Sequence, residues 1–269
     1  MLLTAKQRFL MDTYGYVVIP DVVEADLIER TRQAMDRMDA ELPTADHSEI
    51  YPDGKPRKLT GTPYFSKFGP CIEYDPVFLE MAMHPKVLAY AEEIVGGRVR
   101  YEEQECSINR RNPEERQTDI KSYGWHRGIS PDFSRYAVEG RSHYLWIKAI
   151  VFLTDIGPDD GGTSVIPGTH RTSTDREFVS QLEPWMVHQV QGKAGSVLLF
   201  TESLIHSVTP IRSDNTRYIM ITGYVPPFMR EYDHPSNPSE AFLARLNESA
   251  RTFLTGDQTR RARYDFGRM

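Results

Sequence analysis

The chain has 269 residues, of which 39% are hydrophobic, and a formal net charge of −6. This composition supplies enough apolar side chain for a packed core and argues against disorder, and the negative charge gives no basis for binding a nucleic acid polymer or an anionic membrane surface. Two cysteines, Cys71 and Cys106, are too few for a disulfide framework or a zinc cluster. The chain opens without an apolar signal segment and contains no apolar run long enough to span a bilayer. We therefore expect a globular, cytoplasmic protein.

The first part of the chain, about residues 1–95, is predicted to be mainly helical. Capping residues, apolar spacing at helical intervals and prolines define the predicted helices, which cover residues 4–14, 24–42 and two short segments within 76–95. Residues 16–20 form a short apolar run typical of a strand. Residues 43–75 are rich in Pro, Gly and Asp, and we expect a long loop there.

The middle of the chain, about residues 96–226, changes to a strand pattern. The predicted strands are residues 98–108, 144–156, 196–200 and 218–225, separated by Gly- and Pro-containing turns. Strands of this kind, preceded by helices, fit a mainly β fold with flanking helices, namely a double-stranded β-helix or jelly roll. We expect a single domain over residues 1–269, with a helical tail over about 227–269.

Two histidines, His126 and His206, each lie beside a predicted strand. A neutral imidazole is a good Fe(II) ligand, and two of them from neighbouring strands can bind adjacent faces of one metal. Non-haem Fe(II) oxygenases complete this set with a carboxylate, usually two residues after the first histidine, where this chain has Gly128. Arg217, at the start of a later strand, has the planar fork that binds a carboxylate such as that of 2-oxoglutarate.

These residues and their surroundings resemble the phytanoyl-CoA dioxygenase family of Fe(II)/2-oxoglutarate oxygenases. The resemblance begins at residues 15–20, GYVVIP, and is densest at residues 161–170, GGTSVIPGTH. It includes AIVFLTD at residues 149–155 and ends with GSVLLF at residues 195–200, followed by the second histidine and the arginine. The resemblance implies His126 and His206 as iron ligands, Arg217 as the 2-oxoglutarate anchor, and O2 as co-substrate.

Gly128 is where this chain departs from the family's hydroxylases, which have Asp. Fe(II)/2-oxoglutarate halogenases have Gly or Ala there, with a halide on the iron. The resemblance therefore favours a halogenase that binds chloride in the slot left by Gly128 and chlorinates an unactivated carbon of a small metabolite in natural-product biosynthesis. Two alternatives stay open: a hydroxylase that recruits a carboxylate from elsewhere, first Glu202 and then Asp132, and a non-catalytic metabolite-binding protein.

Basic residues gather in sequence around the first histidine: Arg110, Arg111, Arg116, Lys121, Arg127, Arg135 and Arg141. Interleaved carboxylates offset much of this charge, so a solvated loop is one interpretation. The other is an anionic substrate, for which Arg127 is the main candidate because it lies between His126 and Gly128. Tyr123, Trp125 and Phe133 would supply a flat apolar wall for a ring. A nucleotide satisfies both features and is the first substrate we predict.

Overall fold

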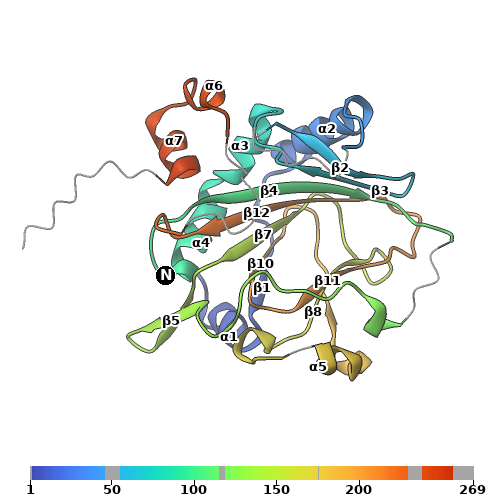
Figure 1. The fold of residues 1–269 in the computed structure, drawn as a ribbon, viewed down its shortest axis with the longest axis vertical. Coiled ribbons are helices and arrows are strands. Elements are labelled where there is room, and N and C mark those ends of the chain that lie inside the picture. The colour runs from blue at the N-terminus through green and yellow to red at the C-terminus, as the bar shows by residue number, and fades with distance from the viewer. Residues whose placement is uncertain (1, 46–54, 115–118, 175, 230–237, 257–269) are drawn as a thin grey trace, which may run out of the picture.

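The computed structural model describes residues 2–45, 55–114, 119–174, 176–229 and 238–256, and its fold is a double-stranded β-helix flanked by helices (Figure 1). The strands are β1 (Tyr16–Ile19), β2 (Arg57–Gly61), β3 (Phe65–Gly69), β4 (Arg100–Asn109), β5 (Arg135–Val138), β6 (Arg141–Tyr144), β7 (Ile147–Phe152), β8 (Gly162–Val165), β9 (His188–Gln189), β10 (Val197–Thr201), β11 (His206–Thr209) and β12 (Arg217–Val225). The helices are α1 (Ala5–Tyr14), α2 (Ala25–Glu41), α3 (Pro76–Ala82), α4 (Pro85–Val95), α5 (Arg176–Ser180), α6 (Glu240–Leu243) and α7 (Glu248–Thr255). Within these ranges, no helix is long and apolar enough to cross a membrane.

Two antiparallel sheets face each other. The larger has seven strands in the order β1-β10-β7-β12-β4-β3-β2, and the smaller has three in the order β11-β8-β9. An isolated antiparallel bridge between His126 and His206 places the segment around His126 beside β11, at the edge of the smaller sheet. Figure 1 shows α2, α3 and α7 on one side of the larger sheet and β8 and β11 on the other.

Strand β7 separates two apolar cores because side chains alternate across a sheet. Ala149 and Val151 pack into the core beneath the helices, together with residues such as Met35. Ile150 and Phe152 face the other way, into the core between the two sheets. The candidate site lies where this second core opens, so the larger sheet is both the floor of the site and the support for the helical layer.

The predicted helices are largely confirmed. Thr4 and Gln7 form the capping box that starts α1, and Gly15 ends it with a left-handed backbone, φ 83°. Helix α2 ends before Pro43, and α3 and α4 are separated at Pro85. The predicted helix at the end of the chain is two helices, α6 and α7.

The loop predicted over residues 43–75 is wrong for its second half. Residues 57–69 contain β2 and β3, which extend the larger sheet beyond β4. No residue of β2 is fully buried, three of the five in β3 are, and the strands end at Gly61 and Gly69, so their apolar pattern is weak. The paired edge of β4, distant in sequence, stabilises them instead. Residues 46–54 of the predicted loop lie outside the described residues.

Candidate metal centre

The two predicted iron ligands lie side by side. The backbone N–H of His126 donates to the carbonyl of His206 at 3.0 Å, and the N–H of His206 donates back at 2.9 Å. Their imidazole rings have centroids 4.2 Å apart. Residues 80 positions apart in the chain are thus paired by one short antiparallel bridge, as two ligands of a single metal require.

Both imidazoles are oriented by backbone carbonyls. The Nδ1 of His126 donates to the carbonyl of Gly124 at 2.8 Å, and the Nδ1 of His206 donates to that of Leu204 at 2.9 Å. A hydrogen bond at Nδ1 fixes the tautomer and leaves the Nε2 lone pair for a metal. Burial lowers the pKa of His206, so this ring is neutral at pH 7, the form that binds a metal.

The space beside Gly128 is filled by Glu202. The backbone N–H of Gly128 donates to the carbonyl of Glu202 at 2.9 Å. A Cβ built on Gly128 would lie 3.0 Å from the Cδ of Glu202 and closer still to its Oε2. The Glu202 carboxylate therefore occupies the place where a side chain at position 128 would begin, and only glycine at 128 leaves room for it.

In the described parts of the chain, no group of three or more His, Cys, Asp or Glu side chains is arranged to hold a metal ion as it stands. The two imidazoles are assembled and the Glu202 carboxylate lies at the edge of the site. Two imidazoles and a carboxylate are the donor set of non-haem Fe(II) oxygenases. The residues present therefore fit Fe(II) by donor chemistry.

Arg217 begins β12 and is buried, with 1% of its surface exposed. Its Nη1 donates to the backbone carbonyl of Asp160 at 3.2 Å, and its Nε has no hydrogen-bond partner among the side chains and backbone described. The Asp160 carboxylate accepts hydrogen bonds from Ser213 and Asn215 instead. Burial lowers the pKa of Arg217 to about 10. A buried cation with an orphaned donor fits an anionic ligand such as a 2-oxoglutarate carboxylate.

The spacing along the smaller sheet also suits this ligand. His206 pairs with Val165, whereas Thr209 pairs with Gly162, next to the guanidinium of Arg217. Three residues along a strand span roughly 10 Å. A dicarboxylate placed between the histidine pair and Arg217 can therefore reach both.

A cavity of about 610 Å³ lies beside the segments that carry the histidine pair, although neither histidine is in its described lining. It begins at Gly124 and Val208, each two residues from a histidine of the bridge, and extends to Asn109, which pairs with Arg217 in the sheet. Its other lining residues are Thr62, Tyr64, Phe65, Arg110, Asn112, Glu114, Tyr123, Thr209, Pro210 and Ile211. Its volume is in the range of small-molecule sites, and its lining mixes apolar surface with hydrogen-bonding side chains, one cation and one anion.

Of the four predicted substrate residues, the structure places only Tyr123 on this cavity, and the described lining does not include the other three. Arg127 donates to the carbonyl of Thr172 at 3.1 Å and contacts the hydroxyl of Thr174, so it holds a loop. The Trp125 indole donates to the carbonyl of Ile120 at 2.6 Å. Phe133 is exposed on a turn. Arg116 of the basic cluster lies outside the described residues.

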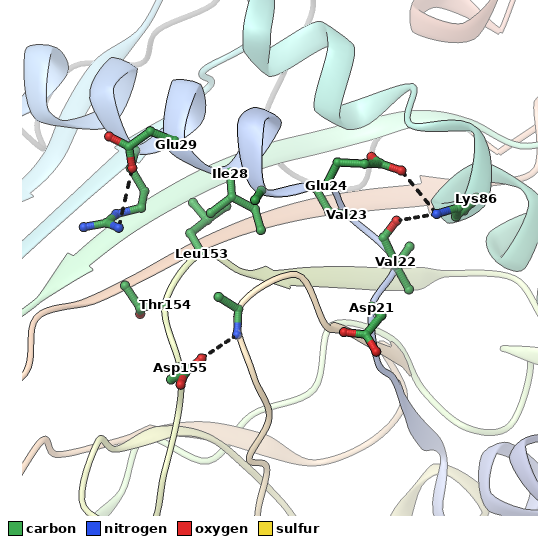
Figure 2. A pocket seen from close by; sticks show the side chains of 13 residues that line it. Asp21, Val22, Val23, Glu24, Ile28, Glu29, Lys86, Leu153, Thr154 and Asp155 are labelled. Atoms are coloured by element: carbon green, nitrogen blue, oxygen red, sulfur yellow. Dashed lines mark hydrogen bonds and ion pairs between the residues drawn. The ribbon is translucent and has the colours of Figure 1, made fainter.

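A second cavity of about 610 Å³ lies on the helical side of the larger sheet, beside the start of α2 (Figure 2). Most of its charged groups already have hydrogen-bond or ion-pair partners. Lys86 donates to the carbonyl of Val22 and to the Glu24 carboxylate, each at 3.2 Å, and the backbone of Ala194 donates to Asp155 at 2.9 Å. The lining has four carboxylates and two cations, but among the described residues no three His, Cys, Asp or Glu side chains are arranged to hold a metal ion, so we place no chemistry there.

Two buried residues near Glu202 were missed by the sequence analysis. Lys148 on β7 and Glu102 on β4 pair at 3.2 Å across the intervening strand β12, and burial raises the pKa of Glu102. The signal that could have found Lys148 is a single charge within the apolar run of residues 144–153. A lysine in a strand buried on both faces must have a buried partner.

The sequence matches the family model of phytanoyl-CoA dioxygenase (PhyH) over residues 11–219, most of the chain. The chain belongs to this family of Fe(II)/2-oxoglutarate oxygenases.

Solved structures share the fold at low sequence identity. HygX from Streptomyces hygroscopicus, with nickel and 2-oxoglutarate bound, is 23% identical with a TM-score of 0.66, and the match covers 86% of this chain and 90% of HygX. The epimerase SnoN from nogalamycin biosynthesis is 18% identical, covers 82% and 79%, and has a TM-score of 0.60. The carbocyclase SnoK from the same biosynthesis is 17% identical, covers 91% of both chains, and has a TM-score of 0.59.

Proposed function

We propose that this chain is an Fe(II)/2-oxoglutarate-dependent oxygenase in which Glu202 supplies the metal-binding carboxylate in place of a residue at 128. The observation that carries the proposal is the Glu202 carboxylate lying where a Cβ of residue 128 would be. Gly128 and Glu202 would then act together, because the missing side chain at 128 leaves the space that the Glu202 carboxylate occupies.

His126, His206 and Glu202 would hold the iron, and Arg217 would bind the distal carboxylate of 2-oxoglutarate. Iron and 2-oxoglutarate, when bound, would allow O2 to oxidise a substrate C–H bond, with 2-oxoglutarate and the substrate each supplying two of the four electrons. The carbonyls of Gly124 and Leu204 keep the two imidazoles in the metal-binding tautomer. Burial of Arg217 strengthens its attraction for a carboxylate because water does not screen it.

The substrate we propose is a small polar natural product that enters the cavity beside the histidine pair. The mixed lining, with Arg110 and Glu114 as its two charges, favours a ligand rich in hydrogen-bonding groups over a strongly anionic one. Fold relatives support this class: HygX has been solved with hygromycin B bound, and SnoN with Fe3+, α-ketoglutarate and nogalamycin RO. A nucleotide remains in the panel of candidate substrates.

Halogenation is the second candidate. It is favoured by the absence of a side chain at Gly128 and by the described residues assembling two imidazoles without a third ligand in place. Against it stands the Glu202 carboxylate in the same space, because a chloride bound there would lie against a buried negative charge.

An anaerobic titration with Fe(II) and 2-oxoglutarate separates the candidates. We would follow the metal-to-ligand charge-transfer band, with and without chloride, in the native protein and in Glu202→Ala. The proposal predicts a band in the native protein that is indifferent to chloride, and Fe(II) binding at least about tenfold weaker in Glu202→Ala. Asp132→Ala is the matched control, because this carboxylate is exposed and bonded to Ser130 and Ser173.

The other outcomes are equally distinct. A chloride-dependent band together with undiminished iron binding in Glu202→Ala would establish the halogenase. No band and no stoichiometric iron in the native protein would indicate a metabolite-binding protein without iron chemistry.

A further inference from the structure

A buried lysine lies between three carboxylates beside the metal centre. Lys148 is on β7 and is 4% exposed. Its Nζ lies 3.2 Å from Oε2 of Glu102 and 4.0 Å from Oε1 of Glu202, and it is in closer contact with Glu103. Because Ile150 faces the core between the sheets, Lys148, two residues earlier on the strand, faces the same way.

Two glycines make room for this cluster. Gly223 pairs with Lys148 across the sheet. A Cβ on Gly223 would overlap Oε2 of Glu102 and lie 3.2 Å from the lysine Nζ. Gly128 leaves the corresponding space for Glu202. Two of the three carboxylates around the lysine, Glu102 and Glu202, therefore occupy the space of an absent side chain.

The two oxygens of Glu202 have different neighbours. Oε1 is the oxygen near Lys148, and Oε2 is the oxygen beside Gly128. We propose that Lys148 is a positioning residue for Glu202, holding Oε1 so that Oε2 alone is offered to the metal. This inference rests on the proposed function, in which Glu202 is an iron ligand.

Restraint of this kind is needed for two reasons. A glutamate has one more rotatable bond than the aspartate it would replace, so ordering its carboxylate costs more entropy. In addition, iron held by two imidazoles and one carboxylate oxygen keeps open the positions that 2-oxoglutarate and O2 require. A Glu202 carboxylate that bound the iron through both oxygens would occupy one of these open positions. An ion pair between Lys148 and Oε1 opposes this second bond.

The test compares Lys148→Met, Lys148→Arg and the native protein. Lys193→Met is the matched control, since Lys193 is a surface lysine paired with Asp155 at 2.7 Å. Fe(II) affinity is measured anaerobically, and Co(II) absorption reports coordination number, because the visible bands weaken as coordination number rises. We expect Lys148→Met to bind Fe(II) about ten- to a hundredfold more weakly and to give weaker Co(II) bands per bound metal. Lys148→Arg should recover most of the native behaviour.

Removing the lysine alone leaves carboxylates buried without a cation, and this variant can fail to fold. The double substitution Lys148→Met with Glu102→Gln removes one charge of each sign and keeps the measurement possible. Loss of iron affinity in Glu202→Ala, but native affinity and native Co(II) bands in the Lys148 variants, would overturn this inference and leave the proposed function standing. Native iron affinity in Glu202→Ala would overturn both.

Discussion

Position 128 and the side chain of Glu202 compete for one space. Gly128→Asp would place a Cβ 3.0 Å from the Glu202 Cδ and a second carboxylate beside a buried one. We expect a loss of about 1–3 kcal/mol in the free energy of unfolding and weaker iron binding. Combining Gly128→Asp with Glu202→Ala removes the steric overlap between the two side chains. It also places the carboxylate two residues after the first histidine, as in the hydroxylases of the family. The double variant should bind Fe(II) more tightly than Glu202→Ala alone, as measured by anaerobic titration.

Gly124→Asp supplies the control for this rescue. Gly124 is in the same segment, and a Cβ built on it meets no described atom within 4 Å. An aspartate there fits sterically but stands on the far side of His126 from Glu202. In the Glu202→Ala background it should leave iron binding as weak as before. Equal recovery of Fe(II) affinity by both aspartates would mean that any added negative charge near the histidines restores iron binding.

His170 gives the fold a specific dependence on pH. Burial, helped by the nearby Arg171, lowers the pKa of His170 to about 4, against about 6.5 in an unfolded chain. The unfolded chain therefore takes up the proton first as the pH falls. The stability contribution is complete above about pH 6.5 and is lost progressively down to about pH 4, by up to about 3 kcal/mol.

Urea unfolding of metal-free protein at pH 7 and pH 4.5 measures this effect. Other groups titrate over the same range, so the informative quantity is the difference between the native protein and His170→Gln. The gap between their free energies of unfolding should narrow as the pH falls. Parallel stabilities at the two pH values would show that His170 is not the group responsible.

At the residue scale, the sequence predicts those candidate ligands whose order along the chain follows the family pattern. His126, His206 and Arg217 were expected from their order and spacing, and the structure brings the two histidines together. Glu202 was open only as an alternative, because nothing in the sequence shows that its carboxylate turns towards Gly128. Lys148 escaped prediction since its partner Glu102 lies 46 positions away, and only the sheet brings the two together.

The turn before β8 sets the position of Arg217. Gly161 has a backbone φ of 64°, and a Cβ there would lie 2.5 Å from the carbonyl oxygen of Thr209 and 2.8 Å from the Arg217 Nη1. Gly161→Ala therefore strains the backbone and pushes against the guanidinium. We expect 2-oxoglutarate affinity to fall about tenfold or more, measured by titration of the iron-loaded protein with 2-oxoglutarate.

Gly140→Ala isolates the backbone strain from the contact. Gly140 turns the β5–β6 hairpin with φ 76°, and a Cβ there meets no described atom within 4 Å. Both alanine variants should lose about 1 kcal/mol or more of stability through the left-handed backbone. Only the variant at Gly161 should lose 2-oxoglutarate affinity. A loss at Gly140 of the same size would assign the effect to general destabilisation.

At the element scale, prediction succeeds for long or strongly patterned segments. Helix α1 has a capping box, α2 has a periodic apolar face, and β7, β10 and β12 are mainly apolar runs. The missed strands are short: β9 has two residues, β5, β6, β8 and β11 have four each, and β2 and β3 have five each. Segments this short have too few residues for a period to show, and their structure comes from the neighbouring strand. Part of the candidate site, including His206, is on such a strand.

At the scale of the whole molecule, the larger sheet separates the helical layer from the candidate metal site. Its outer face carries the helices and the larger core, whereas its inner face carries Lys148, Ile150 and the opening of the candidate site. The double-stranded β-helix was predictable because apolar runs alternate with turns in the order this fold requires. The sequence did not predict which face packs against the helices and which carries the candidate site. A strand that is buried on both faces has no alternation of apolar and polar residues to distinguish them.

This separation predicts that damage to the outer core leaves metal binding intact. Phe253 of α7 is buried against Tyr101 and Tyr224, with ring centroids 6.1 and 6.2 Å away. Phe253→Ala should lower the free energy of unfolding by about 3–5 kcal/mol. Fe(II) affinity, measured anaerobically well below the unfolding temperature, should stay within about twofold of native, because the site keeps its own packing.

Ile150→Ala is the matching change on the inner face. Ile150 is 2% exposed and packs between the sheets, two residues from Lys148 on the same strand. Its loss should destabilise the protein by about 2–5 kcal/mol and also weaken Fe(II) binding, because the cavity it leaves lets β7 and the Lys148 side chain relax. Comparable stability losses with unequal metal binding would show that the sheet isolates the two cores. Equal weakening in both variants would mean that packing on either face reaches the metal, and that the helices are part of the site's support.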